Sequence, residues 1–123
     1  MTIGVLAGLL VTAAPAAAPE AAASLAGDPA RGKLFYQSCS GCHSIDENDV
    51  GPRHRGVVGR PAGAIAGYAY SAALKGSGIV WTPANLDRWL TNPQKLVPGA
   101  KMYFSVGSAQ NRADIIAYLA TQH

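Results

Sequence analysis

Cys39-Ser40-Gly41-Cys42-His43 is the stretch of sequence that decides the fold. Two thiols three positions apart can each add to one of the two vinyl groups on a porphyrin edge, and the adjacent imidazole is then brought under the iron. This Cys-x-x-Cys-His spacing is the attachment signature of a c-type haem. A covalent tether explains how a small chain can keep a haem without enclosing it in a large fold.

The chain has only these two cysteines, and two other uses of them compete with haem attachment. A redox-active dithiol would lie at a helix start within a βαβ pattern, which the sequence lacks. A zinc site would need two further ligands, for which only His54 and His123 remain. We therefore expect one covalently bound haem c with its iron.

The composition leaves room for one small domain. Of the 123 residues 49% are hydrophobic, but ten of these are alanines within the first 26 positions. Charged residues make up 14%, with 10 Lys and Arg against 7 Asp and Glu, a balance that fits neither a disordered polyelectrolyte nor a typical nucleic-acid binder. We expect a monomer that does not bind nucleic acid.

The N-terminal segment resembles a secretory signal. An apolar run over residues 3–14 is too short for a membrane span, and Ser24 and Ala26 supply the small residues that a signal peptidase reads. We expect residues 1–26 to be cleaved as a signal peptide and residues 27–123 to be exported to a bacterial periplasm. Because no Lys or Arg precedes the run, a retained anchor facing the periplasm and a disordered tail remain alternatives.

The remaining chain predicts a small all-α domain of three to five helices with long loops. Asp28-Pro29 begins a helix that extends to about Ser38. Thr82-Pro83 opens another, with Leu86, Trp89 and Leu90 on one face, and Asn92-Pro93 closes it. The last helix, about residues 109–121, carries the stripe Ile115, Tyr118 and Leu119. Gly and Pro interrupt residues 39–71, which indicates a loop wrapped around a ligand.

A haem bound by His43 on one side needs a ligand on the other. Met102 is the only methionine after the initiator and lies in the Pro98-Gly99-Ala100-Lys101-Met102 loop. We expect its thioether to be the sixth ligand, which raises the reduction potential. His54 is the rival, but it follows His43 by only 11 positions, so we expect it at the surface or beside the haem propionates.

With these motifs, residues 27–121 resemble the class I cytochromes c, especially the bacterial cytochrome c2 type. Gly32, Tyr36 and Cys39 match the family's first helix, whose Gly and aromatic meet the terminal helix, where Tyr118 supplies the aromatic. The resemblance implies that the Pro52 carbonyl accepts a hydrogen bond from His43. It also implies that Phe104 screens the haem edge and that four donors serve the propionates, namely Arg60, Tyr68, Tyr70 and Trp81.

Three positions depart from the mitochondrial-type pattern. Trp89, Leu74 and Ala100 stand where that pattern has a tyrosine, an asparagine and a threonine around a buried water near the methionine sulfur. A drier surrounding solvates oxidised haem less well, so we expect a raised potential, with Trp89 against the haem.

With both axial positions of the iron held by protein, no open site is left for a substrate. We expect a one-electron carrier of a respiratory chain or dehydrogenase rather than an enzyme. A haem subunit of a larger oxidoreductase is the alternative, and a peroxidase or ligand sensor a weaker one, since no distal His/Arg pair is found. Basic residues in the segments around the haem suggest a rim that steers the protein to acidic docking faces, although ordinary solubilising charges would look the same: Arg53, Arg55, Arg60, Lys95 and Lys101.

Overall fold

The computed structural model describes residues 4, 8–14 and 25–123. Most of the expected signal peptide therefore lies outside the described residues, and its cleavage stays a prediction. Residues 8–14 are exposed and belong to no helix or strand. Among the helices of the described chain, none combines the length and the apolar character needed to span a bilayer.

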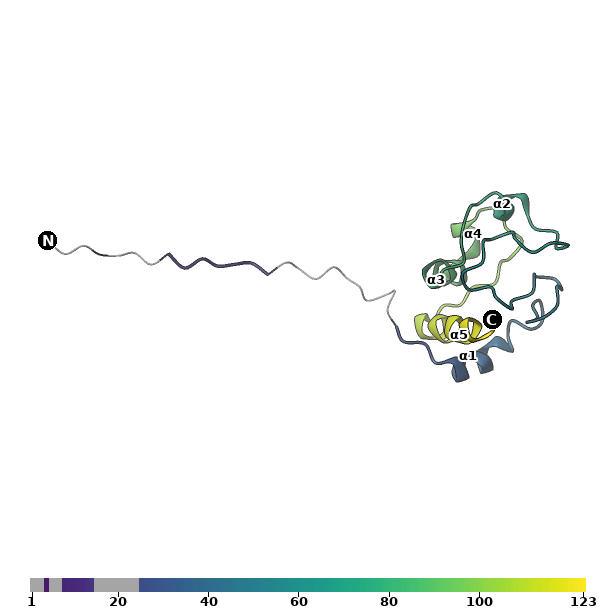
Figure 1. Ribbon diagram of the computed structural model, residues 1–123, viewed down its shortest axis with the longest axis horizontal. Coiled ribbons are helices and arrows are strands. Elements are labelled where there is room, and N and C mark those ends of the chain that lie inside the picture. Colours follow the sequence, from purple (N-terminus) through teal and green to yellow (C-terminus); the bar gives the residue numbers. More distant parts are fainter. Residues whose placement is uncertain (1–3, 5–7, 15–24) are drawn as a thin grey trace.

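The described chain is all-helical, as the sequence predicts. Figure 1 shows the five helices, which are α1 (Pro29–Tyr36), α2 (Ala72–Lys75), α3 (Pro83–Thr91), α4 (Pro93–Leu96) and α5 (Ala109–Thr121). Over residues 25–123 no strand forms, and the nearest approach to one is a single antiparallel bridge between Pro61 and Val80. Long loops fill the space between the helices.

Local capping explains where α1, α3 and α5 begin. The Asp28 carboxylate accepts from the backbone N–H groups of Ala30 and Arg31 at 2.8 and 3.1 Å. The hydroxyls of Thr82 and Ser108 cap α3 and α5 in the same way. Such caps satisfy amides that have no partner inside the helix. The first helix ends at Tyr36, two residues earlier than expected.

The sequence analysis missed the two shortest helices, α2 and α4. Each is a single turn, so neither shows the periodicity that identifies a longer helix. Asn92-Pro93 ends α3 as expected, but the same Asn92 side chain caps α4 by accepting from the Lys95 N–H at 3.1 Å. One dipeptide therefore both stops one helix and starts the next.

The first and last helices pack side by side, which Figure 1 shows at the lower edge of the domain. Gly32 makes this possible, because a Cβ there would lie 2.5 Å from the Asp114 carbonyl carbon and 2.9 Å from the Tyr118 Cβ. The Tyr36 and Tyr118 rings meet at 5.3 Å between centroids. The expected contact of a glycine and two aromatics is confirmed.

A buried carboxylate joins the same two helices. Asp114 is only 3% exposed and accepts from the Asp28 N–H at 2.8 Å, from Arg31 Nε at 2.9 Å and from Gln110 Nε2 at 3.0 Å. The Arg31 guanidinium, followed by the Asp28 amide, holds the pKa of Asp114 well below its usual value. The charge is therefore fully paired where the chain enters α1.

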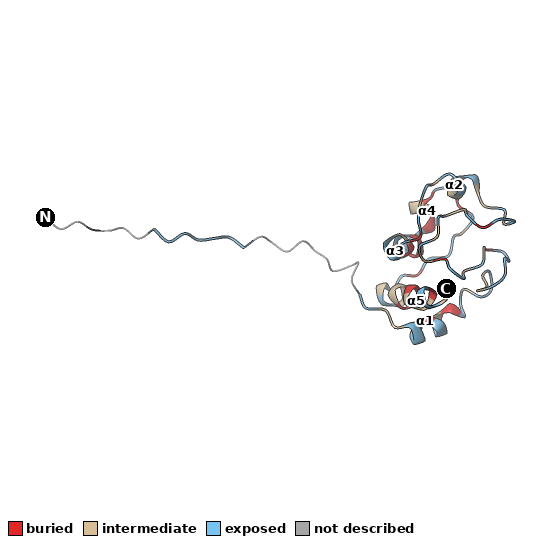
Figure 2. Cartoon of the chain, viewed as in Figure 1, coloured by how far each residue is buried: buried red, intermediate tan, exposed pale blue. Residues whose placement is uncertain are grey.

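The core lies between α5 and α3 and extends into the loops, as the buried residues in Figure 2 show. The predicted apolar faces of α3 and α5 are both in it, apart from Tyr118, which is half-buried. Its buried members are Tyr36, Val57, Trp81, Leu86, Trp89, Leu90, Val97, Ala100, Val106, Ile115, Ile116 and Leu119.

Candidate functional site

A cavity of about 450 Å³ opens between α3, α5 and the loops. Its volume is that of a site for a small molecule or cofactor. All eleven residues that the sequence analysis assigns to haem line this one cavity: Cys39, Cys42, His43, Pro52, Arg60, Tyr68, Tyr70, Trp81, Trp89, Met102 and Phe104. They come from positions 39 to 104, so the fold brings together what the sequence keeps apart.

The two cysteines are presented by a tight turn that follows α1. The Cys42 and His43 N–H groups both donate to the Cys39 carbonyl, at 3.1 and 2.9 Å. Both thiols are free, with Cys39 half-buried and Cys42 exposed. Burial, with a smaller contribution from Cys42, raises the pKa of the Cys39 thiol. Two free thiols and an imidazole on one cavity wall fit a covalently attached haem.

His43 is fixed in one tautomer. Its Nδ1 lies 3.0 Å from the Pro52 carbonyl oxygen, which can only accept, so Nδ1 carries the proton and Nε2 keeps its lone pair. Burial lowers the pKa of His43, and the Pro52 hydrogen bond partly opposes this. Gly51 packs directly on the ring, because a Cβ there would lie 2.5 Å from Nδ1. The imidazole is therefore oriented, and its lowered pKa favours the neutral form that binds a metal through Nε2.

The structure places His54 beside His43, on the same side of the cavity. Its ring is stacked on that of His43, with centroids 4.0 Å apart and planes at 20°, and its Nδ1 lies 3.0 Å from the Tyr36 hydroxyl. Burial, then His43 and Arg60, lower the pKa of His54 to about 3. The histidine is therefore half-buried rather than at the surface, and Arg60, one of the expected propionate donors, is near enough to lower its pKa. As expected, it is no rival for the far side, because the loop through Pro52 folds back and carries it beside His43.

Met102 is half-buried on a loop of defined shape. Gly99 turns this loop with φ of +91°, a conformation that disfavours a side chain. The adjacent Lys101 donates from Nζ to the Ala69 carbonyl at 2.6 Å, which ties the loop to the segment before α2.

The four residues expected near the propionates all line the cavity, and the Trp81 backbone N–H donates to the Arg60 carbonyl at 2.9 Å. The Tyr68 and Tyr70 rings meet edge to face at 4.7 Å. The Arg60 guanidinium donates to the carbonyls of Arg53 and Arg55 at 2.9 and 3.1 Å, and burial lowers its pKa. Within the described chain Arg60 forms no ion pair, so its charge is available to an anion in the cavity.

Two of the three departures from the mitochondrial-type pattern face the cavity. Leu74 and Trp89 line it, and the Trp89 ring meets that of Trp81 at 5.2 Å. Ala100 is buried at 2% exposure but is not part of the lining. Leu74 and Trp89 therefore make the cavity wall itself more apolar than the mitochondrial-type pattern would, whereas Ala100 changes only the region behind the wall.

The cavity opens beside exposed apolar side chains. Tyr103 and Phe104 are 76% and 47% exposed and Val50 is 69% exposed, yet all three line the cavity. An apolar patch around the mouth of a cofactor cavity is a suitable contact surface for a transient partner.

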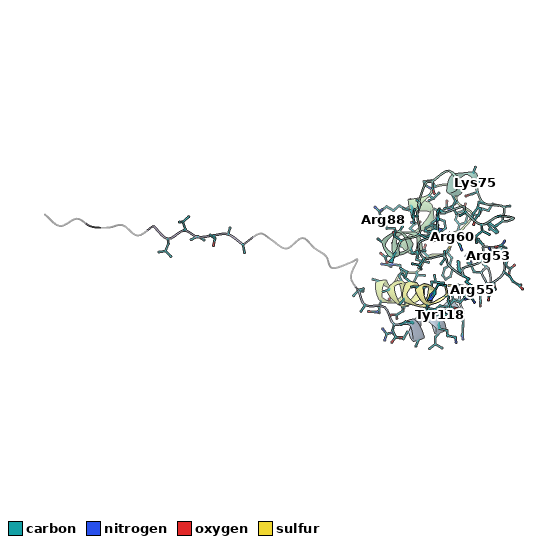
Figure 3. All side chains as sticks on the ribbon, viewed as in Figure 1. Arg53, Arg55, Arg60, Lys75, Arg88 and Tyr118 are labelled. Carbon is teal, nitrogen blue, oxygen red and sulfur yellow. The ribbon has the colours of Figure 1, made fainter. Side chains whose placement is uncertain are left out.

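The predicted basic rim is only partly free. Figure 3 shows Arg53 and Arg55 at the right and lower right of the domain and Arg60 nearer its centre. Arg55 pairs with Asp46 through two nitrogens, and Arg60 turns to backbone carbonyls. Arg53 is exposed and is the least committed of the three.

The zinc alternative finds no support in the described residues, where no three His, Cys, Asp or Glu side chains gather into a metal site. The cavity wall instead combines the imidazoles of His43 and His54 with one thioether and two thiols, and this set includes the donors of a tethered haem.

Comparison with known proteins identifies the fold. The cytochrome c family model matches residues 29–123. Cytochrome c2 of Rhodomicrobium vannielii is 46% identical over 107 residues, covering 84% of this chain and 86% of that protein. Cytochrome c2 of Rhodopila globiformis is 52% identical over 99 residues, covering 77% and 93%. The solved structure of cytochrome cH from Methylobacterium extorquens has a TM-score of 0.75 at 46% identity, covering 77% and 99%.

Proposed function

Because the chain belongs to the cytochrome c family and carries one covalently bound haem c, we propose that His43 and Met102 hold its iron. The chain is an electron carrier of the cytochrome c2 type and not an enzyme. The observation that carries the proposed ligation is the shared cavity, to which His43, Met102 and both cysteines contribute.

The protein residues orient and tune the bound group. Haem c supplies a one-electron couple between ferric and ferrous iron. The Pro52 carbonyl holds the proton of His43 on Nδ1, which keeps Nε2 free as a donor and raises its basicity. The Met102 thioether favours the reduced state. Leu86, Leu90 and Ile115 in the lining exclude water from the cavity.

The wall that holds Arg60, Tyr68, Tyr70 and Trp81 is proposed to receive the two propionates. Two carboxylates at the edge of an apolar cavity need donors or cations to replace lost hydration. The unpaired Arg60 guanidinium meets this need, supported by the two tyrosine hydroxyls and the indole of Trp81.

An absorption spectrum of the oxidised protein tests the ligation. Methionine sulfur on ferric iron gives a weak near-infrared band, and Met102→Ala should remove this band, lower the reduction potential and admit cyanide. A Met102→Ala protein that keeps the wild-type potential and excludes cyanide would contradict the assignment. Haem that is released by acid-acetone extraction of the unfolded wild type would contradict attachment to Cys39 and Cys42.

We further propose that residues 27–123 work in the periplasm, with residues 1–26 serving as a cleaved export signal. N-terminal sequencing of the protein recovered from the periplasmic fraction should begin at Gly27. A sequence that includes residues before Ala26, found in the membrane fraction, would support the retained anchor instead.

The partners are redox proteins, and we propose that they present acidic faces to Arg53, Lys95 and Lys101. Charge reversal at Lys95 should slow electron transfer to the natural acceptor without changing the potential. The wild-type rate should fall as salt shortens the Debye length towards about 8 Å. A rate independent of salt would leave only the apolar patch of Val50, Tyr103 and Phe104 for docking.

A further inference from the structure

One carboxamide on α4 binds the methionine loop at three places. Gln94 is half-buried, and its Nε2 donates to the Ala100 carbonyl at 2.6 Å and to the Met102 carbonyl at 2.9 Å. Its Oε1 accepts from the Gly99 N–H at 3.2 Å. These bonds span the residues from the turn of the loop to the proposed ligand itself.

We propose that Gln94 is the positioning residue that keeps Met102 in place and the sixth position of the iron closed to other ligands. The inference rests on the proposed function, since it concerns the residue assigned there as an iron ligand. Gln94 itself is not part of the cavity lining. It acts only through the backbone that carries Met102.

The loop has little other support besides the bond from Lys101 to the Ala69 carbonyl. It follows α4 as an irregular segment that leads to α5 (Figure 1). Within it the Ala100 N–H donates to the Val97 carbonyl, but the N–H groups of residues 101–105 donate to no backbone carbonyl in the described chain. The Ala100 and Met102 carbonyls take their side-chain hydrogen bonds from Gln94 alone.

The chemistry of the three contacts selects a carboxamide of this length. Two carbonyls require two donors, and one N–H requires an acceptor, which a glutamine amide supplies together. The same requirement fixes which end of the amide is nitrogen. A glutamate would keep only the bond from Gly99, a lysine only the bonds to Ala100 and Met102, and a leucine none.

Loss of these bonds should appear as easier access to the iron. A small anion such as cyanide binds only when the methionine has left, so its apparent affinity is set by the fraction of molecules with an open loop. Removing three hydrogen bonds from one side of the loop raises that fraction. We expect Gln94→Leu to bind cyanide at least tenfold more tightly, a change of about 1.4 kcal/mol or more.

The experiment uses the oxidised holoprotein and begins with the near-infrared band of the wild type. If that band is absent, the proposed Met102 ligation fails, whatever Gln94 does. With the band present, cyanide titration compares the wild type with Gln94→Leu and with two controls. Gln122→Leu makes the same change where the carboxamide bonds only to the Thr121 hydroxyl, and Tyr36→Phe weakens the fold away from the loop. Both controls should stay within about twofold of the wild type.

Cyanide affinity of Gln94→Leu equal to that of the controls would overturn the proposal. Gln94→Glu keeps the shape of the side chain, and it replaces Gln94→Leu in the cyanide titration if the leucine variant yields too little holoprotein. Hydrogen exchange gives a second readout: the Gly99 amide should exchange at least tenfold faster in Gln94→Leu but remain protected in Gln94→Glu. Equal protection of this amide in both variants would show that the carboxamide does not hold the loop.

Discussion

Replacing Gly32 with alanine should force α1 and α5 apart. The new Cβ would lie 2.5 Å from the Asp114 carbonyl carbon and closer still to its oxygen, whereas ordinary contact begins at 3.4 Å, so the helices must separate by more than about 0.9 Å. Backbone atoms cannot rotate aside, so we take the upper end of overpacking costs, about 3 kcal/mol. Alanine favours the helix over glycine by about 1 kcal/mol. The net loss is about 2 kcal/mol.

Thermal unfolding of the holoprotein measures this loss. For a domain of this size about 2 kcal/mol lowers Tm by about 8–16 °C. Lys33→Ala is the matched control, because it introduces the same residue at the next, exposed position of α1 and should change stability by no more than about 0.5 kcal/mol. If Gly32→Ala melts at or above the temperature of Lys33→Ala, the close contact at Gly32 does not govern how α1 packs on α5.

Three further changes probe the site and its supports. Gly51→Ala places a Cβ 2.5 Å from His43 Nδ1, so it should shift the haem absorption spectrum and lower the yield of holoprotein, whereas Gly107→Ala, which meets nothing within 4 Å, should do neither. Asp114→Asn should remove a stabilisation that the wild type has above about pH 4, the usual pKa of an aspartate carboxyl. Because Arg31 holds the pKa of the folded protein's Asp114 below that value, the difference in unfolding free energy between wild type and variant should shrink as the pH falls below about 4. A difference that does not change with pH would contradict the pairing. Tyr36→Phe leaves His54 Nδ1 without its hydroxyl partner and should cost about 1–2 kcal/mol by chemical denaturation, while the double change with His54→Leu should cost less than the two single changes added together.

The helices that the sequence predicted carry their own local signals. Asp28 and Thr82 precede prolines and cap the helices that follow, and α5 is long enough, at 13 residues, to show an apolar stripe. Helices α2 and α4 have no such stripe because each is one turn long. Their presence is set by the tertiary structure around the cavity, which a local pattern does not contain.

Site residues could be predicted where they belong to the haem-attachment motif or match a residue of the family that the chain resembles. The Cys-x-x-Cys-His spacing identified the attachment wall, and the resemblance supplied residues as distant as Arg60 and Trp81, all of which line the cavity. The stacking of His54 on His43 was not predicted, because their separation along the chain says nothing of a loop that folds back. Gln94 was not predicted because its three partners are backbone groups, and the residue types in a sequence do not show which backbone groups a side chain will bind.

The contact between the first and last helices also sets an order of events for the chain. Pro29 and Ala109, where α1 and α5 begin, are 80 positions apart. Closing a loop of that length costs about 2 kcal/mol more than closing a ten-residue loop. A chain made from its N-terminus cannot complete this contact until its last helix is available. Cys39 and Cys42 follow α1 directly, so both thiols are available before α5 can complete this contact.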